Sequence, residues 1–219
     1  MSLVLFAHPF SSYCQKALIA LYENATPFAL RRLDPDDPAS FAELAALWPI
    51  KKFPLLVDGG WPVAEATVII EHLQRQHRGP VRLIPDDPMV ALDVRFMDRF
   101  FDNYVQTPMQ KIVGDARRAA SERDPRGVAD ARGLLDAAYD WLERRLDGHG
   151  WAAGETFSLA DCAAAPALFY ADWTHPIAER FPAVRAYRSR LTARPSFARA
   201  IDEARPYRTL FPLGAPDRD

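Results

Sequence analysis

Two adjacent hydroxyl side chains, Ser11 and Ser12, lie where a short apolar segment gives way to a helical pattern. Residues 3–7 are suited to a buried strand, and Cys14 and Leu18 fall on one face of the helix that would follow. A strand, a loop and a helix start together place a hydroxyl beside unpaired backbone N–H groups. Such a group can stabilise an anion, so Ser11 is the candidate catalytic residue, with Ser12 as the second choice.

The simpler interpretation of these serines is helix capping, because serine is favoured at the residue before the first turn. For residues 8–14 alone, a cap is the better explanation, and Ser12 could do the capping if Ser11 does not. The interpretation of Ser11 as a hydrogen-bond donor therefore depends on a second segment of the chain.

That second segment, residues 50–73, combines three features suited to a small peptide-like anion. Pro54 stands directly before an apolar strand, and an X-Pro bond is the one peptide bond whose cis form costs only about 0.5–1 kcal/mol. A cis bond there would turn the N–H and C=O of Phe53 toward an extended peptide. An Asp-Gly-Gly turn can then return the chain as a hairpin, and Glu65 and Ala66 open a helix whose first N–H groups favour a carboxylate.

The same segments resemble the glutathione S-transferase superfamily, in its bacterial, serine-type, theta- or zeta-like branch. Residues 8–21 are similar to the family's Ser-Pro-Tyr-Cys-Arg-Lys loop, with Ser12 in place of the proline. Residues 48–57 are similar to its Asn-Pro-X-Gly-Lys-Val-Pro-X-Leu segment, and residues 65–73 to its Glu-Ser-X-Ala-Ile helix start. Residues 157–161 resemble its C-terminal capping signature. The resemblance spans nearly the whole chain in the right order.

The pattern of the chain predicts an α/β domain followed by an all-helical domain. Residues 1–78 alternate strand and helix signals, which indicates a small α/β layer, and the resemblance implies a thioredoxin-like domain that binds glutathione. Residues 79–88 contain three prolines and a glycine, which is typical of a linker. In residues 89–219 the strand signal disappears, so this part is expected to be helical.

Individual elements follow from periodicity and from breaker residues. The expected strands are residues 3–7, 28–33, 54–58 and 61–63, and the expected helices of the first domain are residues 12–23, 40–47 and 65–77. In the second domain, a long helix at 89–120 should kink at Pro108. Ser158 and Asp161 form a capping box for a later helix, and the tail from Pro206 onward is expected to be loosely ordered.

The resemblance implies that the second segment binds glutathione as co-substrate. The ammonium of Lys52 would lie near the glycine carboxylate, and the backbone of Phe53, before a cis bond to Pro54, would pair with the cysteinyl part. Glu65 would accept from the γ-glutamyl ammonium group. The N–H of Ala66 would donate to the γ-glutamyl carboxylate.

Two positions depart from the family's pattern. Ala66 lacks the hydroxyl of the family's serine, a deficit of about 0.5–1.5 kcal/mol unless Thr67 compensates. Lys51 stands where the family usually has glycine, so the loop before Lys52 is expected to have a different shape.

A hydrogen bond from Ser11 is needed on energetic grounds if the chain activates the thiol of glutathione. A free thiol titrates near 8.5, and lowering its pKa by about two units requires about 2.7 kcal/mol. A helix N-terminus supplies about 0.3–1 kcal/mol, whereas a hydrogen bond to a charged acceptor adds about 1.5–3 kcal/mol. The two together suffice, so with Pro54 and Glu65 in place we favour Ser11 as donor.

Cys14 invites a redox interpretation, since residues 11–14 align with the Cys-X-X-Cys loop of glutaredoxins. Dithiol exchange needs a thiolate at the first position, and serine occupies it, so Cys14 is expected to be a small buried residue. A pocket for a second, apolar substrate is expected between the domains. Its candidate lining residues are Phe10, Tyr104, Met109 and Trp173.

The leading hypothesis is a glutathione transferase, whose bound thiolate attacks a small hydrophobic electrophile. One alternative is a zeta-like maleylacetoacetate isomerase, because Ser11 and Ser12 resemble its paired serines, although Tyr13 and Cys14 replace the Cys-Ser that follows them in that class. A glutathione-dependent lyase or reductive dehalogenase is a further enzyme hypothesis. The other class is a non-catalytic binding protein on the same fold, which the two departures keep open.

Composition narrows the partners. A formal charge of −2 argues against a general nucleic-acid surface, and no membrane span or secretory signal is recognised. Only two cysteines occur, Cys14 and Cys162, which suits a reducing cytoplasm. The five histidines show no metal-ligand spacing, so no metal is expected. The resemblance implies a homodimer, and the long helix carrying Phe96, Phe100 and Asp102 is a candidate face.

Overall fold

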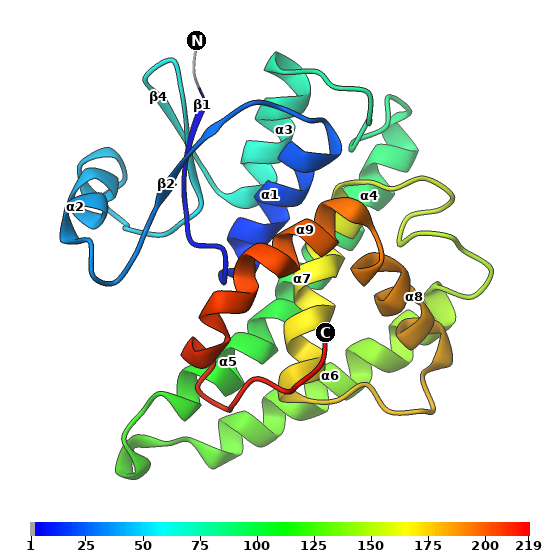
Figure 1. The fold of residues 1–219 in the computed structure, drawn as a ribbon. Coiled ribbons are helices and arrows are strands. Elements are labelled where there is room, and N and C mark those ends of the chain that lie inside the picture. Colours follow the sequence, from blue (N-terminus) through cyan, green and yellow to red (C-terminus); the bar gives the residue numbers. More distant parts are fainter. Residues whose placement is uncertain (1–2) are drawn as a thin grey trace.

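The computed structural model describes residues 3–219, in which a four-stranded sheet with helices on both faces precedes an all-helical part (Figure 1). The strands lie in the order β2-β1-β3-β4; β1 is parallel to β2, and the other two pairings are antiparallel. Their bounds are Leu3–Ala7 for β1, Ala29–Arg32 for β2, Leu55–Asp58 for β3 and Trp61–Ala64 for β4. All four expected strands are present.

Side-chain alternation along β1 gives the sheet two buried faces. The helices of this part are α1 (Ser12–Glu23), α2 (Pro38–Leu47) and α3 (Ala66–Gln76), each within two residues of its expected bounds. Leu5 and Ala7 pack with α1 and α3, whereas Phe6 packs on the opposite face with Leu44 of α2. Figure 1 shows α2 on one side of the sheet and α1 and α3 on the other.

Residues 77–87 form neither helix nor strand, and the elements that follow are helices. Their bounds are Pro88–Phe100 (α4), Thr107–Ala116 (α5), Pro125–Arg145 (α6), Leu159–Thr174 (α7), Pro182–Thr192 (α8) and Pro195–Ala204 (α9), with 3₁₀ turns at Ala120–Glu122 and Arg205–Leu210. No helix within residues 3–219 is long and apolar enough to cross a bilayer.

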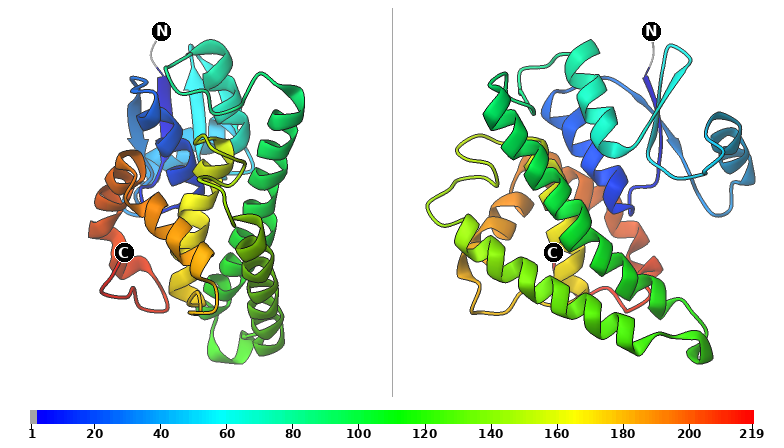
Figure 2. Two further views of the ribbon diagram at one scale, coloured as in Figure 1. Left: turned by 90° about the vertical axis from the view of Figure 1, so that its right-hand side faces the viewer. Right: turned by 180° about the vertical axis from the view of Figure 1, so that it is seen from behind.

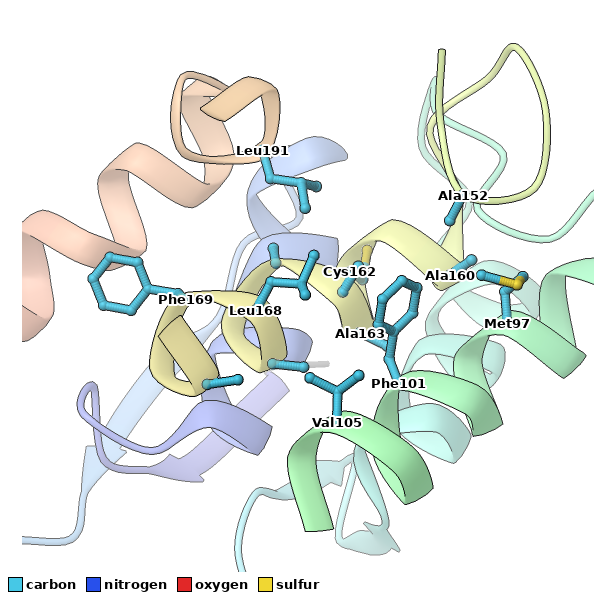
Figure 3. Packing of buried hydrophobic residues seen from close by; sticks show 14 of the residues in the cluster. Met97, Phe101, Val105, Ala152, Ala160, Cys162, Ala163, Leu168, Phe169 and Leu191 are labelled. Carbon is cyan, nitrogen blue, oxygen red and sulfur yellow. The ribbon is translucent and has the colours of Figure 1, made fainter. Parts of the chain in front are cut away.

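Helix α7 forms the centre of the helical part, and every one of its residues is buried. It begins at the predicted capping box of Ser158 and Asp161. Figure 2 shows the other helices arranged around it, and Figure 3 shows its side chains packed against Met97, Phe101 and Val105. Because many side chains of α7 are alanine, its neighbours approach closely and enclose it.

The long helix expected at 89–120 is interrupted before Pro108 rather than simply kinked. Helix α4 passes into a π-helical turn at Phe101–Gln106, and α5 then begins with Pro108 in its first turn. Because proline has no N–H and its ring crowds the carbonyl four residues earlier, the backbone widens just before it. The turn brings Asp102 and Gln106 into contact with α1.

The tail from Pro206 is more ordered than predicted. Arg218 donates to the side chain of Asp172 in α7, and Arg205 donates to Asp219 at 3.0 Å. Proline and glycine end a helix, but the side chains that follow can still form ion pairs with residues far away in the sequence. The expectation of a loose tail is therefore wrong.

Candidate active site

Two adjoining pockets lie between the sheet domain and helices α4 and α5. The larger has a volume of about 750 Å³, and its lining includes all the predicted binding residues, namely Lys52, Phe53, Pro54, Glu65 and Ala66. The smaller has a volume of about 380 Å³ and a lining that includes Phe10, Leu33, Phe41, Met109 and Phe211. Five residues line both pockets: Ser11, Phe53, Gln110, Val113 and Arg117. Ser11 thus lies where the two pockets meet.

Ser11 is the N-cap of α1, so the capping interpretation is correct for this residue. Its Oγ accepts a hydrogen bond from the N–H of Cys14 at 3.5 Å. A serine hydroxyl has two acceptor lone pairs and one donor proton, and this bond uses one lone pair only. Capping by Ser11 is therefore compatible with donation from its O–H to an anion in the pocket.

Ser12 is the first residue of α1 and faces the helical domain. It is buried, and the side-chain amide of Gln106 donates to its Oγ. Ser12 lines the smaller pocket. The expectation that Ser12 does the capping is wrong, because the extended backbone of an N-cap is found at Ser11.

The loop that carries Ser11 is fixed by two residues that the sequence did not single out, Gln15 and Tyr170. Gln15 Nε2 donates to the carbonyl of Pro9 at 2.9 Å and to Tyr170 Oη at 3.1 Å. Tyr170 of α7 in turn donates to the carbonyl of Phe10 at 3.1 Å. The two partners of Tyr170 lie 155 and 160 residues away along the chain, so no local pattern reveals these bonds.

The thiol of Cys14 and the phenol of Tyr13, both near the start of α1, stay protonated at neutral pH. Burial raises the pKa of Cys14 to about 12, which agrees with its interpretation as a small buried residue. Burial, together with the charge of Asp102, raises the pKa of Tyr13 to about 12. Tyr13 lines the larger pocket, so its hydroxyl is a second candidate donor there.

The peptide bond between Phe53 and Pro54 is cis, as predicted. Strand β3 begins only at Leu55, so Phe53 lies just beyond the paired part of the sheet. Among residues 3–219, the N–H and C=O of Phe53 have no backbone partner. A free backbone edge of this kind can pair with an extended peptide.

The two lysines before Phe53 have different roles in the loop. Lys51 has a φ of +59°, in the left-handed region that favours glycine. It therefore holds a backbone conformation that the family's usual glycine would adopt readily. Lys52 is exposed and lines the larger pocket.

Glu65 and Ala66, at the start of α3, line the larger pocket. Glu65 is the N-cap with a φ of +70°, and its side chain makes no capping bond within the described residues. Thr67 is already engaged: Lys16 Nζ donates to its Oγ1 at 2.9 Å, and that hydroxyl donates to Asp98 at 3.0 Å. Thr67 therefore does not replace the hydroxyl that Ala66 lacks.

A cluster of ion pairs joins the start of α3 to the helical domain. Lys16 of α1 is buried, with its Nζ 2.6 Å from Asp98 Oδ1 and 2.8 Å from Asp102 Oδ2. Arg99 pairs with both carboxylates from the surface, with its side chain 51% exposed, so one buried and one half-exposed cation balance the two buried anions. Asp102 is buried in this cluster, and Phe100 is buried in the helical core against Trp141. Of the candidate dimer face, only Phe96 is exposed.

Two of the four predicted liners of the second pocket are confirmed, namely Phe10 and Met109. Tyr104 is instead 46% exposed beside Phe100. Trp173 packs edge-on against Phe211 in the core. The π-helical turn changes the phase of the helix at Tyr104, and periodicity alone could not separate a liner from the core at Trp173.

The sequence matches two family models over most of its length. The glutathione S-transferase N-terminal domain matches residues 5–81, and the glutathione S-transferase C-terminal domain matches residues 116–190. Glutathione S-transferase U7 from Arabidopsis thaliana is 28% identical over 193 residues, which cover 84% of this chain and 78% of that protein. A probable maleylacetoacetate isomerase from Vibrio cholerae is 26% identical over 220 residues, which cover 94% of this chain and 98% of that protein.

A solved structure gives the same result for the fold. The crystal structure of a glutathione S-transferase from Methylobacterium radiotolerans, in complex with glutathione sulfonate, has a TM-score of 0.79 and 28% identity, and the match covers 92% of this chain and 95% of that one. The predicted fold class, a thioredoxin-like domain followed by an all-helical domain, is confirmed. This chain belongs to the glutathione S-transferase superfamily.

Proposed function

We propose that this protein is a glutathione transferase that activates the thiol of glutathione for attack on a small hydrophobic electrophile, a reaction suited to detoxification. The observation that carries the proposal is the position of Ser11, which lines both the larger pocket and the smaller, apolar one. A thiolate at this junction would have its hydrogen-bond donor on one side and its electrophile on the other. The glutathione sulfonate complex of the Methylobacterium relative supports glutathione as co-substrate.

The larger pocket offers a group for each polar part of glutathione. Glu65 would accept from the γ-glutamyl ammonium, and the N–H of Ala66 would donate to the neighbouring carboxylate at the positive end of α3. The N–H and C=O of Phe53, next to the cis bond to Pro54, would pair with the cysteinyl backbone. The ammonium of Lys52 would attract the glycine carboxylate.

The chemistry needs only thiolate stabilisation and proximity, because glutathione itself is the nucleophile. The start of α1 supplies a positive dipole end, and Ser11 supplies a donor hydroxyl beside it. The bonds from Gln15 and Tyr170 hold the loop that positions this hydroxyl.

The test of this role is Ser11→Ala, with Ser12→Ala and Tyr13→Phe as matched hydroxyl deletions. In Ser11→Ala, the pKa of bound glutathione, read from the ultraviolet absorbance of its thiolate, should rise by about 1–2 units, because a hydrogen bond to the anion is lost. The calorimetric affinity for glutathione should stay nearly unchanged. An unchanged pH–rate profile in Ser11→Ala, or a pKa shift in Tyr13→Phe instead, would overturn the assignment of Ser11.

A second candidate function is glutathione-dependent isomerisation of the maleylacetoacetate type. The pair Ser11 and Ser12 and the Vibrio cholerae relative, aligned over 98% of its length, favour this candidate. Glutathione consumption across a panel of substrates separates the two, since a transferase consumes glutathione and an isomerase regenerates it. Absence of binding at millimolar glutathione in calorimetry would contradict both and favour a non-catalytic binding protein.

We further propose that the chain is a cytoplasmic homodimer with domains at 1–78 and 89–219. The stretch without helix or strand at 77–87 supports the division. Cys14 and Cys162 are both free thiols, which supports a reducing compartment. Exposed apolar side chains on α4 support the dimer.

A further inference from the structure

A second cluster of chemistry-bearing side chains lies at the other end of α3, and the proposed function does not use it. Asp58, His72 and His77 each place one ligand atom within 4.8 Å of the others. The Nε2 atoms of His72 and His77 lie 2.8 and 2.7 Å from the same oxygen, Oδ2 of Asp58. The two histidines are 14 and 19 positions from Asp58, which is why their spacing gave no metal signal in the sequence.

The backbone of this cluster is held by regular elements. Asp58 ends β3, where it pairs with Leu3 of β1 and Trp61 of β4. His72 lies within α3, and His77 is its C-cap. The side chains are 14% exposed for Asp58, 22% for His72 and 27% for His77, so the donors are positioned in advance but an ion can reach them.

Two imidazole nitrogens and one carboxylate oxygen form a donor set that suits zinc. Zinc sites with three protein ligands use this set and complete the tetrahedron with water, and imidazole favours transition metals over calcium or magnesium. Around a tetrahedral zinc ion the ligand atoms lie about 3.3 Å apart. The two nitrogen–oxygen distances of 2.8 and 2.7 Å must therefore open by about half an ångström, and the two nitrogens lie within 4.8 Å of each other. The cluster also lies at the C-terminal end of a helix, where the dipole favours a cation.

Without an ion, the same residues form a pair of hydrogen bonds in which each imidazole donates its Nε2–H to Asp58. A ligating nitrogen must offer its lone pair, so on metal binding the proton on each Nε2 moves to Nδ1 of the same ring or leaves to solvent. The two states therefore differ in protonation and in small side-chain rotations, and not in fold.

We propose that Asp58, His72 and His77 bind one zinc ion, which ties the β3–β4 hairpin to the C-terminal end of α3. Helix α3 has 11 residues and is therefore about 16 Å long. Along the helix axis, His72 and His77 lie about 9 and 16 Å from Ala66. The ion would therefore not touch the proposed glutathione contacts at Glu65 and Ala66, so its role is stabilisation of the first domain rather than catalysis.

The direct test is calorimetric titration of tag-free, glutathione-free protein with zinc chloride at neutral pH. We expect one ion per chain with micromolar or tighter affinity, and a loss of at least about tenfold in His72→Ala and in His77→Ala. His149→Ala removes an exposed histidine outside the cluster and should bind zinc like the unaltered protein. Absence of zinc binding by the unaltered protein would overturn the proposal. So would a zinc affinity of His72→Ala and His77→Ala equal to that of the unaltered protein.

A second measurement does not depend on the histidine variants folding correctly. At about a hundredfold excess of zinc over its Kd, the Tm of the unaltered protein should rise by about 5 °C. Asp58→Asn keeps an oxygen that can accept the hydrogen bonds but loses the anionic ligand, so it should lose this rise. An undiminished rise in Asp58→Asn would show that the ion binds elsewhere and would refute the site.

Discussion

At the scale of single residues, the candidate active site depends strongly on backbone conformation. Two of the residues that line the larger pocket, Lys51 and Glu65, have positive φ values, although neither is glycine. Such conformations cost about 1–3 kcal/mol each and persist where the surrounding structure imposes them. A backbone N–H group is present whatever the side chain, so Lys51 and Ala66 keep the backbone donors that glycine and serine would offer at these positions.

A glycine scan of the two neighbouring lysines tests this strain. Lys51→Gly should raise the free energy of unfolding by about 1 kcal/mol, because glycine adopts a positive φ without a steric penalty. Lys52 has a negative φ, so Lys52→Gly should lower the same quantity by about 0.5–1 kcal/mol through backbone entropy. Urea unfolding without glutathione measures both, and changes of the same sign would rule out backbone strain at Lys51.

The two cysteines give a prediction about pH. Burial raises the pKa of Cys14 to about 12 and that of Cys162 well above its ordinary value. In each case the folded-state pKa exceeds the unfolded-state pKa. The contribution of the thiol to the free energy of unfolding is therefore complete below about pH 8.5. It is lost as the pH rises from there toward the folded-state pKa, because the thiol ionises in the unfolded chain first. Neither thiol should react with a thiol reagent in the native protein below that pH, and both should react in denaturant. Rapid reaction of one native thiol would contradict the burial of that residue.

At the scale of elements, the sequence predicted what local patterns determine. The capping box at Ser158, the cis bond at Pro54 and the helix bounds all arise from residues within a few positions of one another. The π-helical turn was missed because Pro108 predicts an irregularity in the helix but does not distinguish a kink from a widened turn. The ordered tail and the contacts of Tyr170 and Lys16 were missed because they depend on partners far along the chain. The pocket lining was only half predicted, because the π-helical turn changes the phase of the helix at Tyr104 and periodicity cannot separate a liner from the core at Trp173.

The ion pairs of Lys16 with Asp98 and Asp102 are buried contacts of this distant kind. Lys16→Met leaves only Arg99, whose side chain is half exposed, to balance the buried carboxylates of Asp98 and Asp102. We expect a loss of about 3–5 kcal/mol in the free energy of unfolding. Lys111→Met removes a lysine whose pair with Asp124 is partly exposed, and it should cost less than about 1 kcal/mol. Equal losses for the two variants in urea unfolding would show that the buried cluster does not lock the domains.

At the scale of the whole molecule, the two pockets exist because the domains meet. The larger pocket takes Phe53 and Glu65 from the sheet domain and Arg99 and Gln110 from the helical one. Helix α1 packs against α7 and α9 of the helical domain, so docking of the domains and positioning of Ser11 are the same structural event. The proposed activity is therefore a property of the assembled chain rather than of the first domain.

One apolar face lies outside this interior. Met89, Leu92 and Phe96 are exposed on α4 at spacings of three and four residues, so they share one side of the helix, and Val68 is exposed on α3. Exposed apolar side chains grouped on one side of a helix suit an interaction site, and a two-fold contact between identical faces is the commonest way for two identical chains to cover them. This face, without Phe100 and Asp102, is the proposed dimer interface.

A charge placed on that face tests the dimer. Light scattering after gel filtration should give the unaltered protein twice the chain mass of 24.7 kDa, and Phe96→Glu should give the mass of one chain, because an unpaired carboxylate cannot be buried in an apolar contact without a large penalty. Leu213→Glu changes an exposed apolar residue of the tail and should leave the dimer intact. If Phe96→Glu and Leu213→Glu both keep the double mass, the interface lies elsewhere. If the unaltered protein has the mass of one chain, the protein is a monomer and each pocket is complete without a partner.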